Sequence, residues 1–131
     1  MTESSFDADT LAVLRDRREV RIETLGPNGE PHRAIIWVVV DESDRVMVRS
    51  WRGASARWYR EAVAHGDAAL VFDGTPRSVR VEVATDATRV EACSRELLAK
   101  YGGGSTARSM VRDEILDTTL ELHPADGLQY P

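Results

Sequence analysis

The stretch that decides the fold is residues 32–51, HRAIIWVVVDESDRVMVRSW. In its first part, residues 32–40, both alternating sets of side chains are apolar: Ala34, Ile36, Val38 and Val40 form one set, and Ile35, Trp37 and Val39 form the other. A strand without a polar face is covered on both sides, so we expect the core on one face and a further layer on the other. The acidic run at 41–44 then turns the chain into a second strand at 45–51.

The rest of the chain surrounds these two strands with similar elements. Alternating apolar positions predict strands at 19–26, 67–73, 77–85 and 117–123, and helical spacing predicts helices at 7–17, 55–65, 88–101 and 105–116. Turn signals such as Pro27-Asn28-Gly29 indicate short hairpins. The sequence therefore predicts a single domain over residues 1–131, mostly β with packing helices (α+β). It has an N-terminal helix at 7–17, an antiparallel barrel over 19–85, two helices within 88–116 and a sixth, last strand at 117–123.

Composition excludes several classes of function. The chain has 17 basic and 22 acidic residues and a formal net charge of −5, which argues against nucleic acid or a membrane surface as a partner. A lone cysteine, Cys93, excludes an internal disulfide framework. The N-terminal segment is acidic and has no long apolar run, so we expect no signal peptide, no membrane span and a cytoplasmic location.

The segment RSWRGASARWYREAV, residues 49–63, places arginines where the third predicted strand ends and a helix begins. A helix start carries partial positive charge, so each arginine there is unfavourable by about 0.3–1 kcal/mol. An anion bound to the first backbone N–H groups, to the hydroxyl of Ser55 as N-cap and to the guanidinium groups would reverse that sign. Gly53 would let the backbone approach such an anion closely. Two other interpretations stay open: the arginines pair with carboxylates or solvent, and the tryptophans belong to the core or to an oligomer interface.

The order of motifs over residues 26–72 resembles a known superfamily. Its members are the FMN- and deazaflavin-binding split β-barrels, which include pyridoxamine-phosphate-oxidase-like proteins and deazaflavin-dependent reductases. The similar features are the turn with Gly29, the apolar strand 34–40, the strand end at Ser50, the loop with Gly53 and the Trp58-Tyr59 pair at the helix opening. The tail LLAKYGGG, residues 97–104, looks like that of a bacterial subgroup. The resemblance implies a six-stranded antiparallel split β-barrel of the FMN-binding type.

The resemblance also implies a cofactor site. The phosphate-holding positions of the family are similar to Arg49, Ser50, Gly53, Ser55, Ala56 and Arg57, with Arg33 and Arg52 as further candidates. Ile36, Trp37 and Val38 would lie beside the cofactor ring, and Trp58 belongs to the same set. The cofactor is FMN or the deazaflavin coenzyme F(420), and the sequence leaves that choice open. The family also implies a homodimer with the cofactor near the interface, which would cover the second face of strand 32–40.

The resulting hypothesis is a small oxidoreductase that transfers hydride to a small organic substrate with a flavin or deazaflavin, without a named catalytic side chain. Two alternatives remain, a non-catalytic binder of a flavin or haem-type molecule and a dimeric interaction module. No metal site is predicted, because the histidines at 32, 65 and 123 stand far apart without a carboxylate at metal-ligand spacing. His32 is expected to be an exposed loop residue.

Overall fold

The computed structural model describes residues 6–102 and 104–125. Its elements follow one another as α1 (Ala8–Asp16), β1 (Val20–Leu25), β2 (Pro31–Ile36), β3 (Val39–Val40), β4 (Val46–Val48), η1 (Gly53–Ser55), α2 (Arg57–His65), β5 (Asp67–Phe72), β6 (Thr75–Val83), α3 (Ala87–Tyr101), α4 (Ser105–Ser109), η2 (Asp113–Thr118) and β7 (Leu120–Pro124). The ends of the predicted domain, 1–5 and 126–131, and residue 103 lie outside the described residues.

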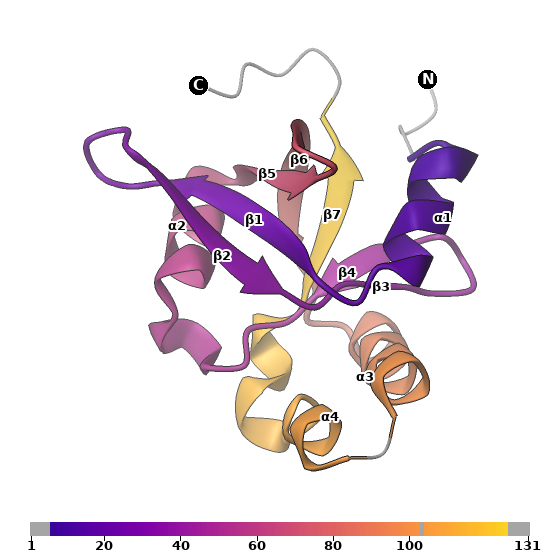
Figure 1. Cartoon of the computed structure of the whole chain (residues 1–131). Coiled ribbons are helices and arrows are strands. Elements are labelled where there is room, and N and C mark those ends of the chain that lie inside the picture. The colour runs from indigo at the N-terminus through magenta and orange to yellow at the C-terminus, as the bar shows by residue number, and fades with distance from the viewer. Residues whose placement is uncertain (1–5, 103, 126–131) are drawn as a thin grey trace.

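The strands form a curled antiparallel sheet in the order β2-β1-β5-β6-β7-β4-β3 (Figure 1). The described residues contain seven strands rather than the predicted six, because the predicted strand 32–40 is two strands. β2 pairs with β1, so that Ile36 lies opposite Val20, whereas β3 pairs with β4, so that Val39 lies opposite Met47. These two strands follow each other in the chain, yet they form the opposite edges of the sheet. The half-barrel is therefore open between them, and the chain crosses the opening at Trp37 and Val38.

The break has a physical cause in helix α3. The N–H of Val38 donates to the Tyr101 hydroxyl at 3.3 Å, and the carbonyl of Val38 accepts from Lys100 Nζ at 2.7 Å. Because a buried backbone group needs a partner, these side chains replace the neighbouring strand at this residue. The apolar pattern of 32–40 has no interruption, so the sequence gives no sign of the break.

Two apolar cores result from this arrangement. The larger lies within the curl of the sheet and includes Leu14 of α1, Val38 and Leu70 of β5. The smaller lies against α3, where Met47 of β4 packs with Cys93 and other inward-facing side chains of that helix. The expected second layer over strand 32–40 is incomplete in this chain, because Ile35 is 59% exposed.

The helices agree with the predicted ones except at the start of α2 and near the C-terminus. Asp7 caps α1 by accepting a hydrogen bond from the Thr10 N–H at 2.8 Å, and Asp86 caps α3 in the same way. The predicted helix 105–116 is two shorter pieces, α4 and η2, because the backbone turns extended at Arg112, with ψ of 151°. The last strand starts three residues later than predicted, since η2 continues to Thr118. Among the described helices, none combines the length and the apolar character needed to cross a bilayer.

Candidate functional site

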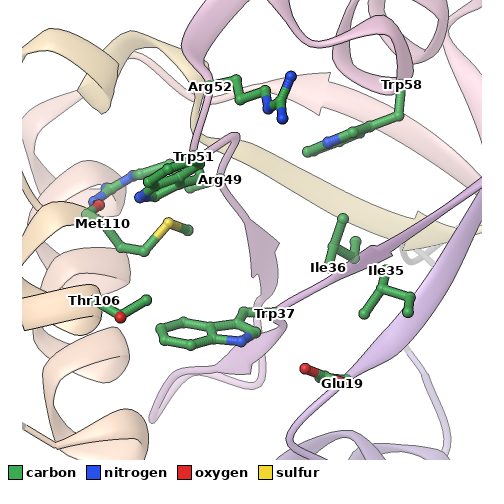
Figure 2. Close-up of a pocket in the computed structure, with 10 residues that line it drawn as sticks. All are labelled: Glu19, Ile35, Ile36, Trp37, Arg49, Trp51, Arg52, Trp58, Thr106 and Met110. Carbon is green, nitrogen blue, oxygen red and sulfur yellow. The ribbon is translucent and has the colours of Figure 1, made fainter.

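A pocket of about 340 Å³ opens where the break between β2 and β3, the loop after β4 and helix α4 come together (Figure 2). The three tryptophans of the chain, Trp37, Trp51 and Trp58, all line it. They come from three separate segments, the β2–β3 break, the loop after β4 and helix α2. We call this cavity the tryptophan pocket. Its volume lies at the lower end of the range for small-molecule sites, and indole rings offer large and rigid contact surfaces.

The remaining lining combines apolar and charged groups. Ile35, Ile36 and Met110 add apolar surface. Arg52 lies beside Trp51 and Trp58, whereas Glu19 lies at the opposite end beyond Trp37 (Figure 2). Arg52 is exposed, and within the described residues its guanidinium has neither a hydrogen bond nor an ion pair. The pocket therefore has an unpaired cation at one end and a carboxylate at the other.

The exposed Trp51 is held in place by the C-terminal elements. Its indole Nε1 donates to Ser109 Oγ at 2.9 Å. Arg112 Nη2 donates to the carbonyl of Trp51 at 2.6 Å, and its guanidinium carbon lies 5.8 Å from the centre of the indole. These contacts fix an indole that is 52% exposed, so the wall of the pocket is preformed although it borders solvent.

Arg49 borders the tryptophan pocket, but its side chain serves the interior. The residue is 1% exposed. Its guanidinium donates to Thr119 Oγ1 at 2.9 Å, to Ser94 Oγ at 2.8 Å, and to the carbonyls of Met110 and Val90 at 3.0 Å each. Burial lowers the pKa of Arg49. A phosphate at the position implied by the sequence would have to displace these bonds to reach Arg49, so we leave Arg49 out of the ligand-binding set.

Ser50 and Gly53 form the turn that leads from β4 to η1. Ser50 is fully buried, its hydroxyl donates to the carbonyl of Gly53 at 2.7 Å, and its N–H donates to Thr118 Oγ1 at 3.1 Å. Gly53 has φ of +67°, a conformation that favours glycine because it has no Cβ. The turn therefore fixes the direction of the exposed loop, and the Ser50 hydroxyl is already engaged.

The start of helix α2 differs from the prediction. The helix begins at Arg57 with Ala56 as N-cap, and no side chain caps it. Ser55 belongs to η1 instead, where its hydroxyl donates to the carbonyl of Arg52 at 2.8 Å. The prediction of Ser55 as N-cap is therefore wrong, because the 3-10 turn moves the helix start two residues along the chain. Arg57 at the first helical position is exposed.

A second pocket of about 270 Å³ shares Trp58 with the first. Its other lining residues are His32, Arg33, Ala34 and Arg57, so β2 and α2 together supply its basic groups. We call it the basic pocket, because no carboxylate is among its described lining residues.

Carboxylates hold two of these basic side chains in place. Arg33 Nε donates to Glu23 Oε1 at 2.7 Å. His32 Nδ1 lies 3.0 Å from both carboxylate oxygens of Glu61, which also accepts a hydrogen bond from Thr24 Oγ1 at 2.8 Å. Burial raises the pKa of Glu61, but the hydrogen bonds from His32 and Thr24 outweigh it, so the pKa is lowered. His32 is thus half-buried and paired rather than an exposed loop residue, and its partner lies 29 residues away, which no sequence spacing reveals.

The other predicted ring contacts divide into two groups. Ile36 and Trp37 line the tryptophan pocket. Val38 is fully buried in the larger core, and both its backbone groups are bonded to Lys100 and Tyr101. Ala56 is also buried, at 8% exposure. The structure therefore brings Ile36, Trp37, Arg52 and Trp58 together at one pocket and turns Val38 inward.

A separate polar cluster lies on β6 and β7. Glu82, Glu121 and His123 bring one ligand-type atom each to within 4.8 Å of one another, and His123 Nε2 is 2.8 Å from Glu82 Oε1. His123 therefore does have a carboxylate partner, contrary to the expectation from spacing. Arg89 Nη1 lies 2.9 Å from Glu121 and 3.2 Å from Glu82. Because an arginine already compensates both carboxylates, we assign no metal to this cluster.

Residues 10–122 match a family described as uncharacterized proteins conserved in bacteria, DUF2255. The chain belongs to this family. No curated protein matches the sequence.

Solved structures identify the fold of this DUF2255 protein. The conserved hypothetical protein Rv2991 of Mycobacterium tuberculosis is 16% identical with a TM-score of 0.63, over 92% of this chain and 79% of that one. The heme storage protein HutZ of Vibrio cholerae is 10% identical with a TM-score of 0.63, over 94% and 92%. An F420 reductase is 16% identical with a TM-score of 0.55, over 87% and 91%. At these identities the similarity shows the split-barrel fold, which confirms the fold implied by the sequence motifs.

Proposed function

We propose that this DUF2255 protein binds a flavin or deazaflavin and acts as a small oxidoreductase on a small organic substrate. The observation that carries the proposal is the convergence of all three tryptophans on one pocket that also holds an unpaired arginine, Arg52. Large aromatic side chains at the rim of a cavity suit a planar aromatic ligand. An exposed guanidinium beside them suits a ligand that carries negative charge.

The two pockets together fit the two parts of such a ligand. The tryptophan pocket would hold the ring, between the indoles and the apolar surface of Ile35 and Ile36. The basic pocket lies next to it across Trp58 and offers Arg33 and Arg57, while Arg52 stands at the loop between them. Phosphate is bound well by arginines beside a helix start, because the guanidinium groups and the free N–H groups of the first turn act together. The proposed anion-binding residues are therefore Arg33, Arg52 and Arg57.

A bound flavin or deazaflavin supplies the hydride chemistry itself. The chain's own contribution is to orient the ring, to balance its charge with Arg52 and to exclude water with the three indoles. None of these roles requires an acid or base from the protein, and we name no catalytic side chain.

A haem ligand is the alternative suggested by the similar fold of HutZ. Haem iron is held by His, Cys, Tyr or Met side chains. The described residues that line the tryptophan pocket include no His, Cys or Tyr, and Met110 is their only sulfur donor. The lining therefore favours a ligand that needs no axial protein ligand.

A second copy of the chain would complete the site. Ile35 and Trp51 border the tryptophan pocket and are 59% and 52% exposed, the two largest values among the exposed large apolar side chains. Burying both on a symmetry mate would remove this apolar surface from water and close the pocket. We therefore expect a homodimer, which light scattering coupled to size exclusion measures directly.

Ligand titrations followed by tryptophan fluorescence test the proposal. The unchanged protein and the Arg52→Ala and Arg57→Ala variants are each titrated with riboflavin, FMN and F(420). We expect quenching by riboflavin in all variants, and binding of FMN weakened about tenfold by either substitution, the usual effect of losing a charge-assisted hydrogen bond. Arg95→Ala is the matched control, because Arg95 is exposed on α3 and lines neither pocket.

The outcomes separate the hypotheses. Preference for F(420) over FMN would identify a deazaflavin protein, and the reverse preference a flavoprotein. Binding without reduction of the bound ligand by a nicotinamide donor, and without reoxidation of the chemically reduced ligand by an organic acceptor, would indicate a non-catalytic carrier. A folded dimer that binds none of the three ligands would contradict the proposal and favour an interaction module.

A further inference from the structure

Trp37 lies at a point where the backbone has no strand partner, yet its ring is tightly held. The centre of the indole is 3.8 Å from the centre of the Tyr101 ring, and the two planes differ by 3°. Tyr101 is the last residue of α3, 64 positions further along the chain. Since Tyr101 covers one face of the indole, only the other face and the edges of Trp37 are left to meet a ligand in the tryptophan pocket.

Tyr101 is itself fixed at both its hydroxyl and its ring. The hydroxyl donates to the carbonyl of Arg18 at 2.6 Å and accepts from the N–H of Val38 at 3.3 Å. The guanidinium carbon of Arg18 lies 5.0 Å from the ring centre, and Lys100 Nζ lies 5.3 Å from it. Cations at this distance from an aromatic face are attracted by its quadrupole. The phenol therefore has little freedom to move away from Trp37.

Lys100 completes the arrangement. Its ammonium donates to the carbonyl of Val38 at 2.7 Å and to the carbonyl of Leu14 at 2.8 Å, and it has no ion pair within the described residues. It is the only lysine of the chain. A half-buried cation bonded only to two carbonyls joins the end of α1, the residue after Trp37 and the last turn of α3. Neither Lys100 nor Tyr101 lines the tryptophan pocket.

We propose that Lys100 and Tyr101 are positioning residues for the ligand ring, because they set the plane and depth of Trp37 in the tryptophan pocket. The inference rests on the proposed function for the ligand, but the positioning itself belongs to the chain alone. Lys100 fixes the backbone at Val38, and Tyr101 fixes the indole. A ring ligand would then meet a preformed indole wall and would not have to order it on binding, which improves affinity.

The first test follows Trp37 without any ligand. A variant with Trp51→Phe and Trp58→Phe leaves Trp37 as the only tryptophan, so its fluorescence anisotropy and its quenching by acrylamide report on this side chain alone. Adding Tyr101→Leu or Lys100→Met should lower the anisotropy and raise the quenching constant. Leu98→Ala, an exposed position on the same helix, should change neither. Unchanged anisotropy and quenching in both Tyr101→Leu and Lys100→Met would overturn the inference.

The second test asks whether the effect on binding passes through Trp37. In the otherwise unchanged chain, Tyr101→Leu should weaken riboflavin binding about 3- to 10-fold, the range measured for an aromatic pair. In a Trp37→Leu background, the same substitution should cause no further loss. Equal losses in both backgrounds would mean a general effect on the fold and would overturn the inference. Tyr101→Phe, which keeps the stack and loses only the hydroxyl, serves if Tyr101→Leu does not fold, and a smaller loss is expected from it.

The two tests keep this inference separate from the proposed function. If the unchanged chain binds no flavin while Trp37 loosens in the Tyr101→Leu variant, the proposed function fails and the positioning role stands. If flavin binds and Trp37 does not loosen, the proposed function stands and the positioning role fails.

Discussion

Replacing Arg49 by methionine distinguishes the two roles that the sequence and the structure give to this residue. Methionine keeps much of the apolar length of the side chain and removes the guanidinium. The structure predicts that the main consequence is loss of stability. A phosphate-binding arginine at the surface would instead lose affinity for the ligand and leave stability nearly unchanged.

The size of the loss follows from the four hydrogen bonds of the guanidinium. The hydroxyl of Thr119 also donates to the carbonyl of Leu116, and the Ser94 hydroxyl is free to rotate, so these two groups adapt. The carbonyls of Met110 and Val90 lose a charged donor in a buried place. At about 1–3 kcal/mol for each buried acceptor that loses its partner, the two carbonyls together cost about 2–6 kcal/mol. We expect the lower part of this range, a decrease of about 2–4 kcal/mol in the free energy of unfolding, because the substitution also removes a buried charge.

A competing effect acts in the opposite direction. Burial lowers the pKa of Arg49, which means that the charged form is disfavoured by its surroundings. Replacing a buried charge by an apolar group is neutral or stabilising in some proteins. We expect the hydrogen bonds to dominate, because four well-placed acceptors surround one guanidinium.

Urea and thermal unfolding measure the result. A decrease of 2–4 kcal/mol corresponds to a fall in Tm of roughly 8–16 °C for a chain of this size, at about 4 °C per kcal/mol. Arg95→Met, at an exposed position of α3, is the control and should leave Tm unchanged. An equal or higher Tm for Arg49→Met would refute the reasoning, and a loss of FMN affinity at unchanged Tm would restore Arg49 to the ligand site.

Three further predictions follow from the backbone and from one half-buried cation. Gly53→Ala should lower the free energy of unfolding by about 1–2 kcal/mol in urea titrations, because an L-residue is strained at φ of +67°; an unchanged midpoint would show that the turn relaxes at no cost. Ser55→Ala should change stability by less than about 0.5 kcal/mol, whereas Asp86→Ala should cost about 1 kcal/mol, because of these two residues only Asp86 caps a helix. Equal losses would restore Ser55 as a cap. Burial lowers the pKa of Lys100 from 10.5 to about 8, so the unfolded chain binds more protons than the folded chain between these pH values. The free energy of unfolding of the unchanged chain, relative to that of Lys100→Met, should therefore rise from pH 8 to 10.5, by at most about 3 kcal/mol. A flat difference over that range would contradict the burial of the charge.

The sequence determined the elements of the half-barrel and several of their ends. Alternating apolar positions located the strands, because the side chains of a strand point to opposite faces of a sheet with a period of two. Asp7, which caps α1, lies at the first position of the predicted helix 7–17, and the turn at Gly53 was visible as a glycine between β4 and the helix. These features depend on residues close together in the chain, so local patterns record them.

The tertiary structure alone decided which of the predicted residues face a ligand. The acceptors of Arg49 lie 41 to 70 residues away, and the partner of His32 lies 29 residues away, so neither pairing leaves a trace in local spacing. The break at Trp37 and Val38 is invisible in an uninterrupted apolar run, because that run records burial and not the group that satisfies the backbone. The break is caused by Lys100 and Tyr101 of α3. In the sequence, these two residues indicate only the end of an amphipathic helix. Local pattern thus determined the strands and helices. Long-range packing determined that Arg49 is buried while Arg52 is exposed, and it brought three distant tryptophans to one pocket.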